Sequence, residues 1–315
     1  MPPATVAALL DRLGEYWSIP ADLEVTLEAN PSSIEAQKFA DFRAAGVNRV
    51  SVGVQSFDDT ALRFLGRAHS ANEAADAISI AEQSFDRVSF DLIYALPGQT
   101  ASAWASELTA ALARGNGHLS LYQLTIEKGT PFYADHLRGA FTLPEEDLAA
   151  DLYELTGEMT AKAGYTAYEV SNYARNGQES RHNLVYWRGG DYIGVGPGAH
   201  GRLTLDGERL RTEQVPGPAG WLSAVGEAGH ATRVSEPVPV TEQAEEYLMM
   251  GLRLADGIDR THFERIVGQP LDACLNGAKV AALCHAGLLE ADTRGIRATA
   301  AGIQRLNAII AEISL

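Results

Sequence analysis

The sequence contains very little cysteine, and this shortage argues against a disulfide framework or a cysteine-rich metal centre. Only two of its 315 residues are cysteines, Cys274 and Cys284, and both lie in a segment (residues 271–292) that is predicted to be helical with a possible break at Gly277. Within one helix, ten residues of rise would separate their Cα atoms by about 15 Å, which is beyond the reach of a disulfide or a shared metal ion. Two buried thiols are therefore the favoured interpretation.

Basic residues are also scarce. The chain has 25 Lys and Arg against 41 Asp and Glu, which gives a formal net charge of −16, and no basic tract interrupts this excess. Such a balance disfavours binding to nucleic acid or to an anionic membrane surface. No apolar run approaches the roughly 20 residues of a membrane-spanning helix, and Met1-Pro2-Pro3 lacks the charged start and apolar core of a signal peptide. We therefore expect a cytoplasmic protein without a membrane-spanning segment.

What the sequence does contain is a series of strand-like runs separated by amphipathic segments. Apolar and polar residues alternate in the first two runs, which is the period of a strand with two different faces. The runs cover residues 23–31, 49–57, 87–99 and 118–127, and the predicted helices cover residues 2–17, 33–46, 71–83 and 102–115. This order of strands and crossover helices predicts a parallel α/β layer over residues 1–127.

The remainder of the chain is predicted to form two further modules. Residues 128–215 are richer in Gly, Tyr and Pro and are interpreted as an irregular covering segment with one helix at 145–163. Residues 216–315 are predicted to be mostly helical and, from residue 241, to combine three helices, a hairpin (288–299) and a final helix, which suggests a winged-helix-like shape. That last part has 7 Lys and Arg against 10 Asp and Glu, so a docking or lid role is favoured over nucleic-acid binding.

Polar residues end the predicted strands, where the carboxyl ends of parallel barrel strands usually form a ligand site. The alternation aims Glu28 and Gln55 into one interior, and Asp91 and Gln123 end comparable positions in the next two runs. Glu28 could bind an ammonium group or ribose hydroxyls, or be a solvated acid at the strand end. Gln55 follows Gly53, which would let a ligand approach the backbone; alternatively it ties strand ends together.

Two charged residues have similarly open interpretations. Arg67, in LGRAHS, would supply a fork for a carboxylate, or it is simply exposed. Asp91 is flanked by Phe90 and Leu92, and an acid in an apolar strand is costly unless it has a partner. That partner could be a ligand or a structural cation.

The motifs taken in order resemble a known family. EANP, GVNRVSVGVQSF, LGRAH, FDLIYALPGQT and LYQLTIEKGT follow one another as in the radical S-adenosylmethionine proteins of the oxygen-independent coproporphyrinogen III oxidase group. Within that group, YEVSNYA (168–174), RHNLVYW (181–187) and DYIGVGPGAHG (191–201) resemble the heme chaperone branch, HemW. The resemblance covers nearly the whole chain and implies a fold: a parallel (β/α) partial barrel of the α/β class, here incomplete.

The resemblance also implies site residues. It places Glu28, Gln55, Arg67 and Asp91 at the family's S-adenosylmethionine-binding positions. The segment implicated in heme binding is matched by a second set: His182, Asn183, Tyr186 and Trp187.

The heme motif has a physical interpretation of its own. A neutral imidazole of His182 can ligate heme iron, and the rings of Tyr186 and Trp187 offer flat surfaces to a porphyrin. The alternative is a packed aromatic turn with a hydrogen-bonded histidine. His200, in a Gly-rich turn, is a second candidate ligand or propionate partner, although a structural role is favoured there.

Family members begin with a strand and a CxxxCxxC loop that holds a [4Fe–4S] cluster, followed by a strand ending in GGGTPS. Neither motif occurs in this sequence, and Cys274 and Cys284 cannot replace the loop. We therefore expect no cluster and no reductive cleavage of S-adenosylmethionine by this chain, which leaves its status as an enzyme open. The absent strands would expose an apolar edge beside the strand of Glu28. A fragment whose start was set at an internal Met is favoured over a truncated protein that tolerates this edge.

The expected function is that of a heme chaperone, which binds heme and delivers it to an apo-hemoprotein such as a respiratory-chain component. The alternative is oxygen-independent coproporphyrinogen III oxidase, whose oxidative decarboxylation in porphyrin biosynthesis needs the cluster and a second cofactor molecule. An unrelated α/β-barrel hydrolase that uses Asp91 and Glu28 as acid and base is a third, disfavoured by the order of the motifs.

Overall fold

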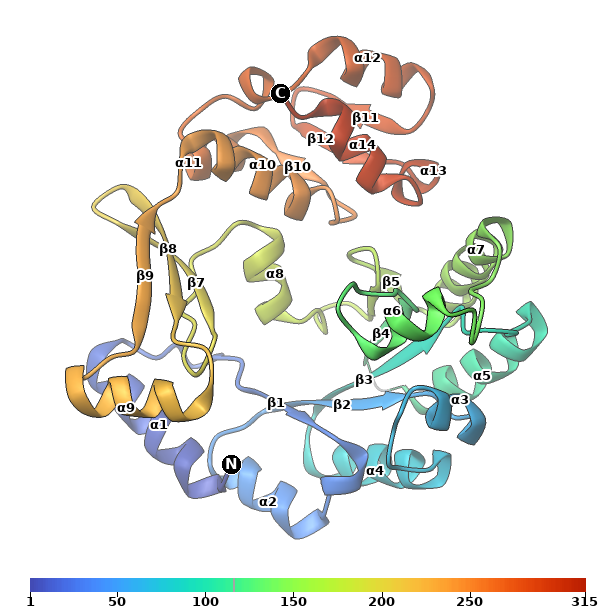
Figure 1. Ribbon diagram of the computed structural model, residues 1–315, viewed down its shortest axis with the longest axis vertical. Helices are drawn as coiled ribbons and strands as arrows, with labels where there is room; N and C mark the ends of the chain where they lie inside the picture. The colour runs from blue at the N-terminus through green and yellow to red at the C-terminus, as the bar shows by residue number, and fades with distance from the viewer. Residues whose placement is uncertain (116) are drawn as a thin grey trace. The chain divides into compact units, whose positions relative to one another are not determined.

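The computed structural model of the protein describes residues 1–115 and 117–315 (Figure 1). The chain forms two compact units, Met1–Ser180 and Arg181–Leu315. The boundary between them falls inside the segment 128–215 that is predicted to cover the α/β layer. None of the described helices is long and apolar enough to cross a lipid bilayer.

The first unit contains a mixed sheet with the strand order β1-β2-β3-β4-β6-β5. Its parallel part confirms the predicted α/β layer: β1 (Thr26–Ala29), β2 (Arg49–Gln55), β3 (Arg87–Tyr94) and β4 (Gly117–Gln123). Two short antiparallel strands extend it, β6 (Asn172–Ala174) and β5 (Thr166–Ala167). These two strands, of three and two residues, come from the predicted covering segment 128–215. The sheet is open, as expected for a partial barrel.

Helices connect the parallel strands, and side-chain caps start α4 (Ala71–Ser84) and α5 (Ala101–Arg114), whereas α2 (Ala36–Ala44) begins without one. Before the helix that precedes β3, the Ser70 side chain accepts a hydrogen bond from the amide of Glu73, whose carboxylate accepts one from the amide of Ser70. This capping box satisfies two amides that the first turn leaves unpaired. The helices of this unit are α1 (Pro3–Tyr16), α2 (Ala36–Ala44), α3 (Asp59–Phe64), α4 (Ala71–Ser84), α5 (Ala101–Arg114), α6 (Pro131–Leu137) and α7 (Glu146–Lys162), with a 3-10 turn η1 (Pro31–Ser33).

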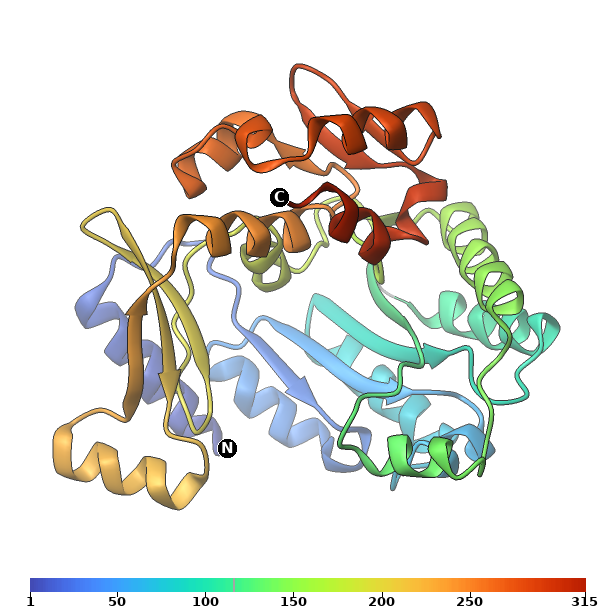
Figure 2. The same ribbon diagram turned by 45° about the horizontal axis from the view of Figure 1, so that its top comes forward.

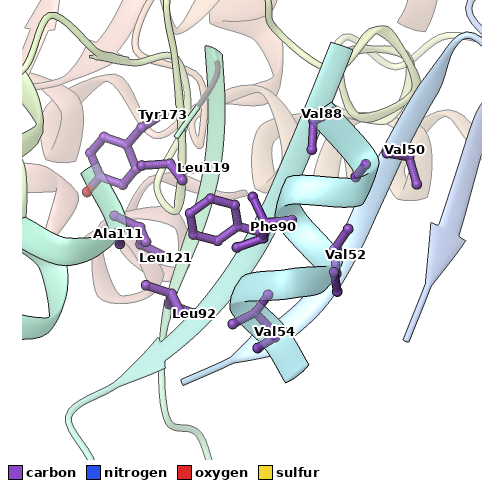
Figure 3. Packing of buried hydrophobic residues seen from close by; sticks show 14 of the residues in the cluster. Val50, Val52, Val54, Val88, Phe90, Leu92, Ala111, Leu119, Leu121 and Tyr173 are labelled. Carbon is purple, nitrogen blue, oxygen red and sulfur yellow. The ribbon is translucent and has the colours of Figure 1, made fainter. Parts of the chain in front are cut away.

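The two faces of the parallel sheet differ in chemistry because successive side chains of a strand alternate between faces. One face is apolar and packs against α2, α4 and α5 (Figures 1 and 2). Figure 3 shows this core, to which three neighbouring strands contribute Val50, Val52, Val54, Val88, Phe90, Leu92, Leu119 and Leu121. The residues between them, such as Ser51, Ser89 and Ser120, lie on the opposite face. This polar face carries the candidate site.

The second unit begins with α8 (Arg181–Trp187) and contains two small antiparallel sheets. The first, β7-β8-β9, was not predicted; its strands are β7 (His200–Leu205), β8 (Glu208–Gln214) and β9 (Thr232–Pro237). The second, β10-β12-β11, includes the predicted hairpin; its strands are β10 (Ile258–Asp259), β11 (Leu289–Ala291) and β12 (Gly295–Ala298). The remaining helices are α9 (Pro218–Ala228), α10 (Val240–Gly251), α11 (Arg260–Val267), α12 (Gly277–His285), α13 (Ala300–Ile303) and α14 (Leu306–Ile313).

The cysteine segment does not form one helix. Cys274 ends a 3-10 turn, η2 (Leu271–Cys274), whereas Cys284 lies in α12. The chain breaks between them because the Asn276 side chain accepts a hydrogen bond from the amide of Lys279 and starts a new helix at Gly277. Both thiols are free and partly buried.

Candidate functional site

The polar face of the parallel sheet brings together three of the four residues predicted to bind S-adenosylmethionine. Register pairs Glu28 with Ser51 and Asp91 with Ser120, so both acids project from the same face. Glu28 is exposed and Asp91 is only partly exposed. Arg67 follows α3 and is close enough to Asp91 to affect its ionisation.

Asp91 is the electrostatic centre of this group. The pKa of its carboxyl is raised to about 6, chiefly because burial removes water from it. The Glu28 carboxylate also raises this pKa, whereas Ser120, Arg49 and Arg67 lower it. Asp91 can therefore change its protonation state just below neutral pH, which suits a group that accepts or donates a hydrogen bond to a ligand.

Gln55 ends β2 in a strained conformation beside the same site. Its backbone is left-handed, with a φ of 72°, and the register between β2 and β3 shifts between Val52 and Gln55. A Cβ atom at Gly53 would lie 3.3 Å from Gln55 Nε2 and 3.8 Å from the carbonyl oxygen of Ala29. The missing side chain of Gly53 thus makes room for the Gln55 amide next to the end of β1.

The loop that carries Arg67 is fixed to the end of β2. The Arg67 amide donates to the carbonyl of Leu62, and His69 Nε2 lies 2.9 Å from the carbonyl oxygen of Val54. His69 is buried, and because a carbonyl only accepts, this ring nitrogen carries the hydrogen. The buried histidine holds the loop of Arg67 at the end of β2, where Gln55 lies. Asp91 was expected at a strand end, but it lies in the middle of β3, three residues before Tyr94.

Gln123 has a different role from the one its position suggested. Its Nε2 donates to the carbonyl oxygen of Ala149 at 2.7 Å, and Ala149 belongs to α7. The side chain therefore ties β4 to a covering helix.

A buried hydrogen-bond chain behind Asp91 was missed from the sequence. Glu169 Oε1 accepts from Asn172 Nδ2 at 2.5 Å, and Asn172 Oδ1 accepts from Ser120 Oγ at 2.8 Å. The bond to Glu169 fixes which end of the amide faces Ser120, so the Ser120 hydroxyl must donate to Asn172. Ser120 on β4 and Asn172 on β6 are 52 positions apart in the sequence. The YEVSN motif was the available sequence signal for Glu169 and Asn172.

The opposite end of the polar face is filled by buried charged groups that were also missed. Arg49 donates to Ser89 Oγ at 2.9 Å, and Arg87 pairs with Glu24 at 2.6 Å. The pKa of His118 is lowered to about 3 by burial and by both arginines, so its ring is neutral at physiological pH. Arg49, Arg87 and the neutral His118 lie at the amino-terminal ends of β2, β3 and β4, where side chains of a barrel usually serve stability.

The residues predicted to bind heme lie on α8, in the second unit. The rings of His182 and Tyr186, four residues apart, meet edge to face with 4.9 Å between their centroids, and Tyr186 meets Tyr192 at 4.5 Å. His182 is exposed, while Asn183 and Tyr186 are partly exposed. The three rings form an accessible aromatic edge with an imidazole at one end.

Trp187 is held on a different side of α8. The Arg253 guanidinium lies 4.9 Å from the centre of its ring, in a cation–π contact. Its buried Nε1 has no hydrogen-bond partner among the residues that the structure describes. That Tyr186 and Trp187 both offer flat surfaces to a porphyrin stays a prediction.

Comparison with known proteins places these sites in a family. The radical SAM superfamily matches residues 3–108 and the HemN C-terminal domain matches residues 238–305. The bovine protein named radical S-adenosyl methionine domain-containing protein 1, mitochondrial, is 42% identical over 98% of this chain and 71% of its own length. Heme chaperone HemW of Escherichia coli is 39% identical over 82% of this chain and 67% of its own length. The chain belongs to the HemW branch of the HemN-like radical SAM proteins.

The fold of this HemW-branch chain is shared with a solved structure, coproporphyrinogen III oxidase (HemN) from Escherichia coli. The TM-score is 0.78 at 23% identity, over 99% of this chain and 74% of the other. At that identity the match establishes the fold alone, and it confirms the α/β partial barrel inferred from the motif order.

The residues present fit the cofactors of this family unequally. Among the described residues, no group of three or more His, Cys, Asp or Glu side chains could hold a metal ion, so the residues do not fit a [4Fe–4S] cluster. The polar face does fit a nucleoside with an amino-acid tail, because both acids, Arg67 and the Gln55 amide that packs over Gly53 are grouped there. α8 fits heme through an exposed imidazole and adjacent aromatic rings.

Proposed function

We propose that this protein binds heme on α8 and delivers it to an apo-hemoprotein. The exposed edge-to-face pair of His182 and Tyr186 carries the proposal, because an imidazole at the end of an aromatic edge can ligate iron while rings contact the porphyrin. Asn183 belongs to the same proposed site, and Trp187, whose ring lies under Arg253, would contribute from the other side of α8. Relatives named heme chaperone HemW support it.

The polar face of the first unit has a second role in the proposal, as a site for S-adenosylmethionine. Glu28, Gln55, Arg67 and Asp91 would hold the ligand through hydrogen bonds and charge, with the Gln55 amide placed over Gly53 beside the end of β1. When bound together with a cluster, S-adenosylmethionine supplies radical chemistry. The residues of this chain contribute binding and orientation.

The acceptor and the location of the protein are parts of the same proposal. A respiratory-chain hemoprotein is the expected acceptor, and a cytoplasmic location is expected from the sequence. Three of the animal relatives are named mitochondrial, so the location stays a prediction. The family assignment does not support the hydrolase alternative, and the likeness to HemN concerns the fold and does not favour the oxidase activity.

A heme titration tests the proposal. Hemin added to the purified chain should give a saturable 1:1 shift of the Soret band, and His182→Ala should abolish it. His285→Ala is the matched control, since His285 is an exposed helical histidine at the end of α12 in the same unit; it should bind as the wild type does. Wild-type affinity and spectrum in His182→Ala would reject the assignment of the ligand.

A further inference from the structure

A cavity of about 650 Å³ lies within the second unit, next to the end of α8. Its wall is formed by the turn after α8, by α10 and α11, by the loop before β10, and by the β11–β12 hairpin. The groups that matter here are Arg188, Tyr247, His262, Arg265 and Arg294. None of them was singled out from the sequence.

Three guanidinium groups of the wall have no ionic partner. Arg188, Arg265 and Arg294 are exposed, and none forms an ion pair with a carboxylate of the residues that the structure describes. Arg297, in the same wall, differs because it pairs with Glu290. Unpaired arginines that line one cavity are suited to bind an anion, and their planar forks match a carboxylate in particular.

The acidic groups of the wall are mostly engaged with backbone. Asp259 accepts from the amide of His262 as the cap of α11, and Asp292 accepts from the amides of Arg294 and Gly295. Glu290 forms an ion pair with Arg297. Asp256 is the remaining acid of the wall, and among the described residues it has neither a backbone hydrogen bond of this kind nor an ion pair. The guanidiniums are thus the groups available to a ligand.

His262 positions two of the arginines. The Arg265 guanidinium donates to Nδ1 of His262, and Nε2 lies 2.8 Å from the carbonyl oxygen of Arg188. Because arginine only donates and a carbonyl only accepts, Nδ1 is the acceptor and Nε2 carries the hydrogen. A single neutral tautomer therefore holds the α11 arginine and the turn after α8 at the same cavity.

Tyr247 adds a hydroxyl to this group and anchors α8. Its ring is 5% exposed and stacks on Phe263, with centroids 5.5 Å apart. Burial and the nearby Asp259 raise the pKa of Tyr247 to about 12 against the effect of Arg188 and Arg265, so the hydroxyl stays a donor.

Gly189 brings the end of α8 against this ring. A Cβ atom at Gly189 would lie 3.3 Å from Tyr247 Cδ2, and the backbone there is left-handed with a φ of 64°. Glycine thus allows the close approach that places Arg188 at the cavity.

We infer that this cavity is the binding site for the propionate carboxylates of heme held on α8, an inference that rests on the proposed function. The Arg188 amide still donates to the carbonyl of Leu184, so the helical path continues from His182 to Arg188. Six residues of helix rise by about 9 Å and turn Arg188 by roughly 120° around the axis from His182. A propionate would therefore reach the cavity around the carboxyl end of α8, where Arg188 follows the last helical residue. In a chain of net charge −16, an anionic ligand needs local cations of this kind.

The test compares hemin with its dimethyl ester, which keeps the iron and the ring and lacks free carboxylates. Arg188→Gln and Arg265→Gln should each raise the Kd for hemin by about tenfold, the effect of one charge-assisted hydrogen bond. Neither should change the Kd for the ester. Arg297→Gln is the control from the same wall. Because Arg297 is already paired with Glu290, this substitution should leave the Kd unchanged for both ligands.

The outcomes separate the inference from the function on which it rests. Unchanged hemin binding in Arg188→Gln and Arg265→Gln, with dependence on His182 intact, would overturn the propionate site and leave heme carriage standing. Equal losses for hemin and ester would also overturn it, because carboxylate recognition cannot weaken the ester. If the wild-type chain binds neither ligand, the proposed function falls and the inference falls with it.

Discussion

At the scale of single residues, Asp91 shows how a strand in an apolar environment can carry a functional group. Its flanking residues, Phe90 and Leu92, belong to the buried core, while its own side chain lies on the polar face. The sequence predicted that such an acid would need a partner, and the structure places Glu28 and Arg67 near it. The ligand roles of these residues, of Gln55 and of the α8 residues stay predictions.

The raised pKa of Asp91 predicts a pH dependence of stability. An ordinary aspartate loses its proton near pH 3.8, whereas Asp91 loses it near pH 6 in the folded chain, so the folded state holds the extra proton between these values. Stability contributed by this group is therefore lost as pH rises from about 4 to about 6. Asp91→Asn, which mimics the protonated acid, should be more stable than the wild type at pH 7 by on the order of 3 kcal/mol.

Urea denaturation at pH 4 and at pH 7 measures this effect. The unfolding free energy of the variant should exceed that of the wild type by more at pH 7 than at pH 4. Comparing the two proteins at each pH cancels the contribution of His118 and of other groups that both contain. Asp76→Asn, at an exposed position on α4, should show little change. A constant difference for Asp91→Asn would contradict the prediction.

The polar chain of Ser120, Asn172 and Glu169 could not be predicted for a physical reason. Alternation within a strand tells which side chains share a face, yet it does not tell which distant segment pairs with the strand. β6 pairs with β4 across 52 residues, and only that pairing brings Asn172 to Ser120. Long-range pairing of a three-residue strand leaves no periodic signal in the sequence.

At the scale of elements, predictions succeeded where a strand is buried on one face and failed where it is not. β2 and β3 alternate between core and polar face, and this pattern is visible in the sequence. β7 and β8 are mostly exposed or half-buried. In β7 only Leu203 and Leu205 alternate with polar residues, and β8 carries charged residues on both faces, so the apolar alternation is too short to mark the pair. Asp206-Gly207 at their turn was the available hairpin signal, since both residues are left-handed.

Gly207 is therefore predicted to control this hairpin. Its φ is 83°, a conformation that an L side chain adopts with strain. Gly207→Ala should destabilise the β7–β8 pair by about 1 kcal/mol, which would appear as faster hydrogen exchange of the amides of β7 and β8. The comparison is Gly226→Ala, because Gly226 lies inside α9 with open space around its Cα. That substitution should slow exchange in α9, and equal effects of both changes would reject the role of the turn.

At the scale of the whole molecule, the net charge of −16 acts on any charged ligand before contact. Hemin carries two carboxylates against one positive charge on its ferric centre, so it is repelled, while its dimethyl ester is attracted. Salt screens both interactions. On the proposed function, raising ionic strength from low to physiological values should speed hemin association and slow ester association. Stopped-flow measurements on monomeric porphyrin test these signs, and slopes of the same sign for both ligands would show that the overall charge does not govern their approach.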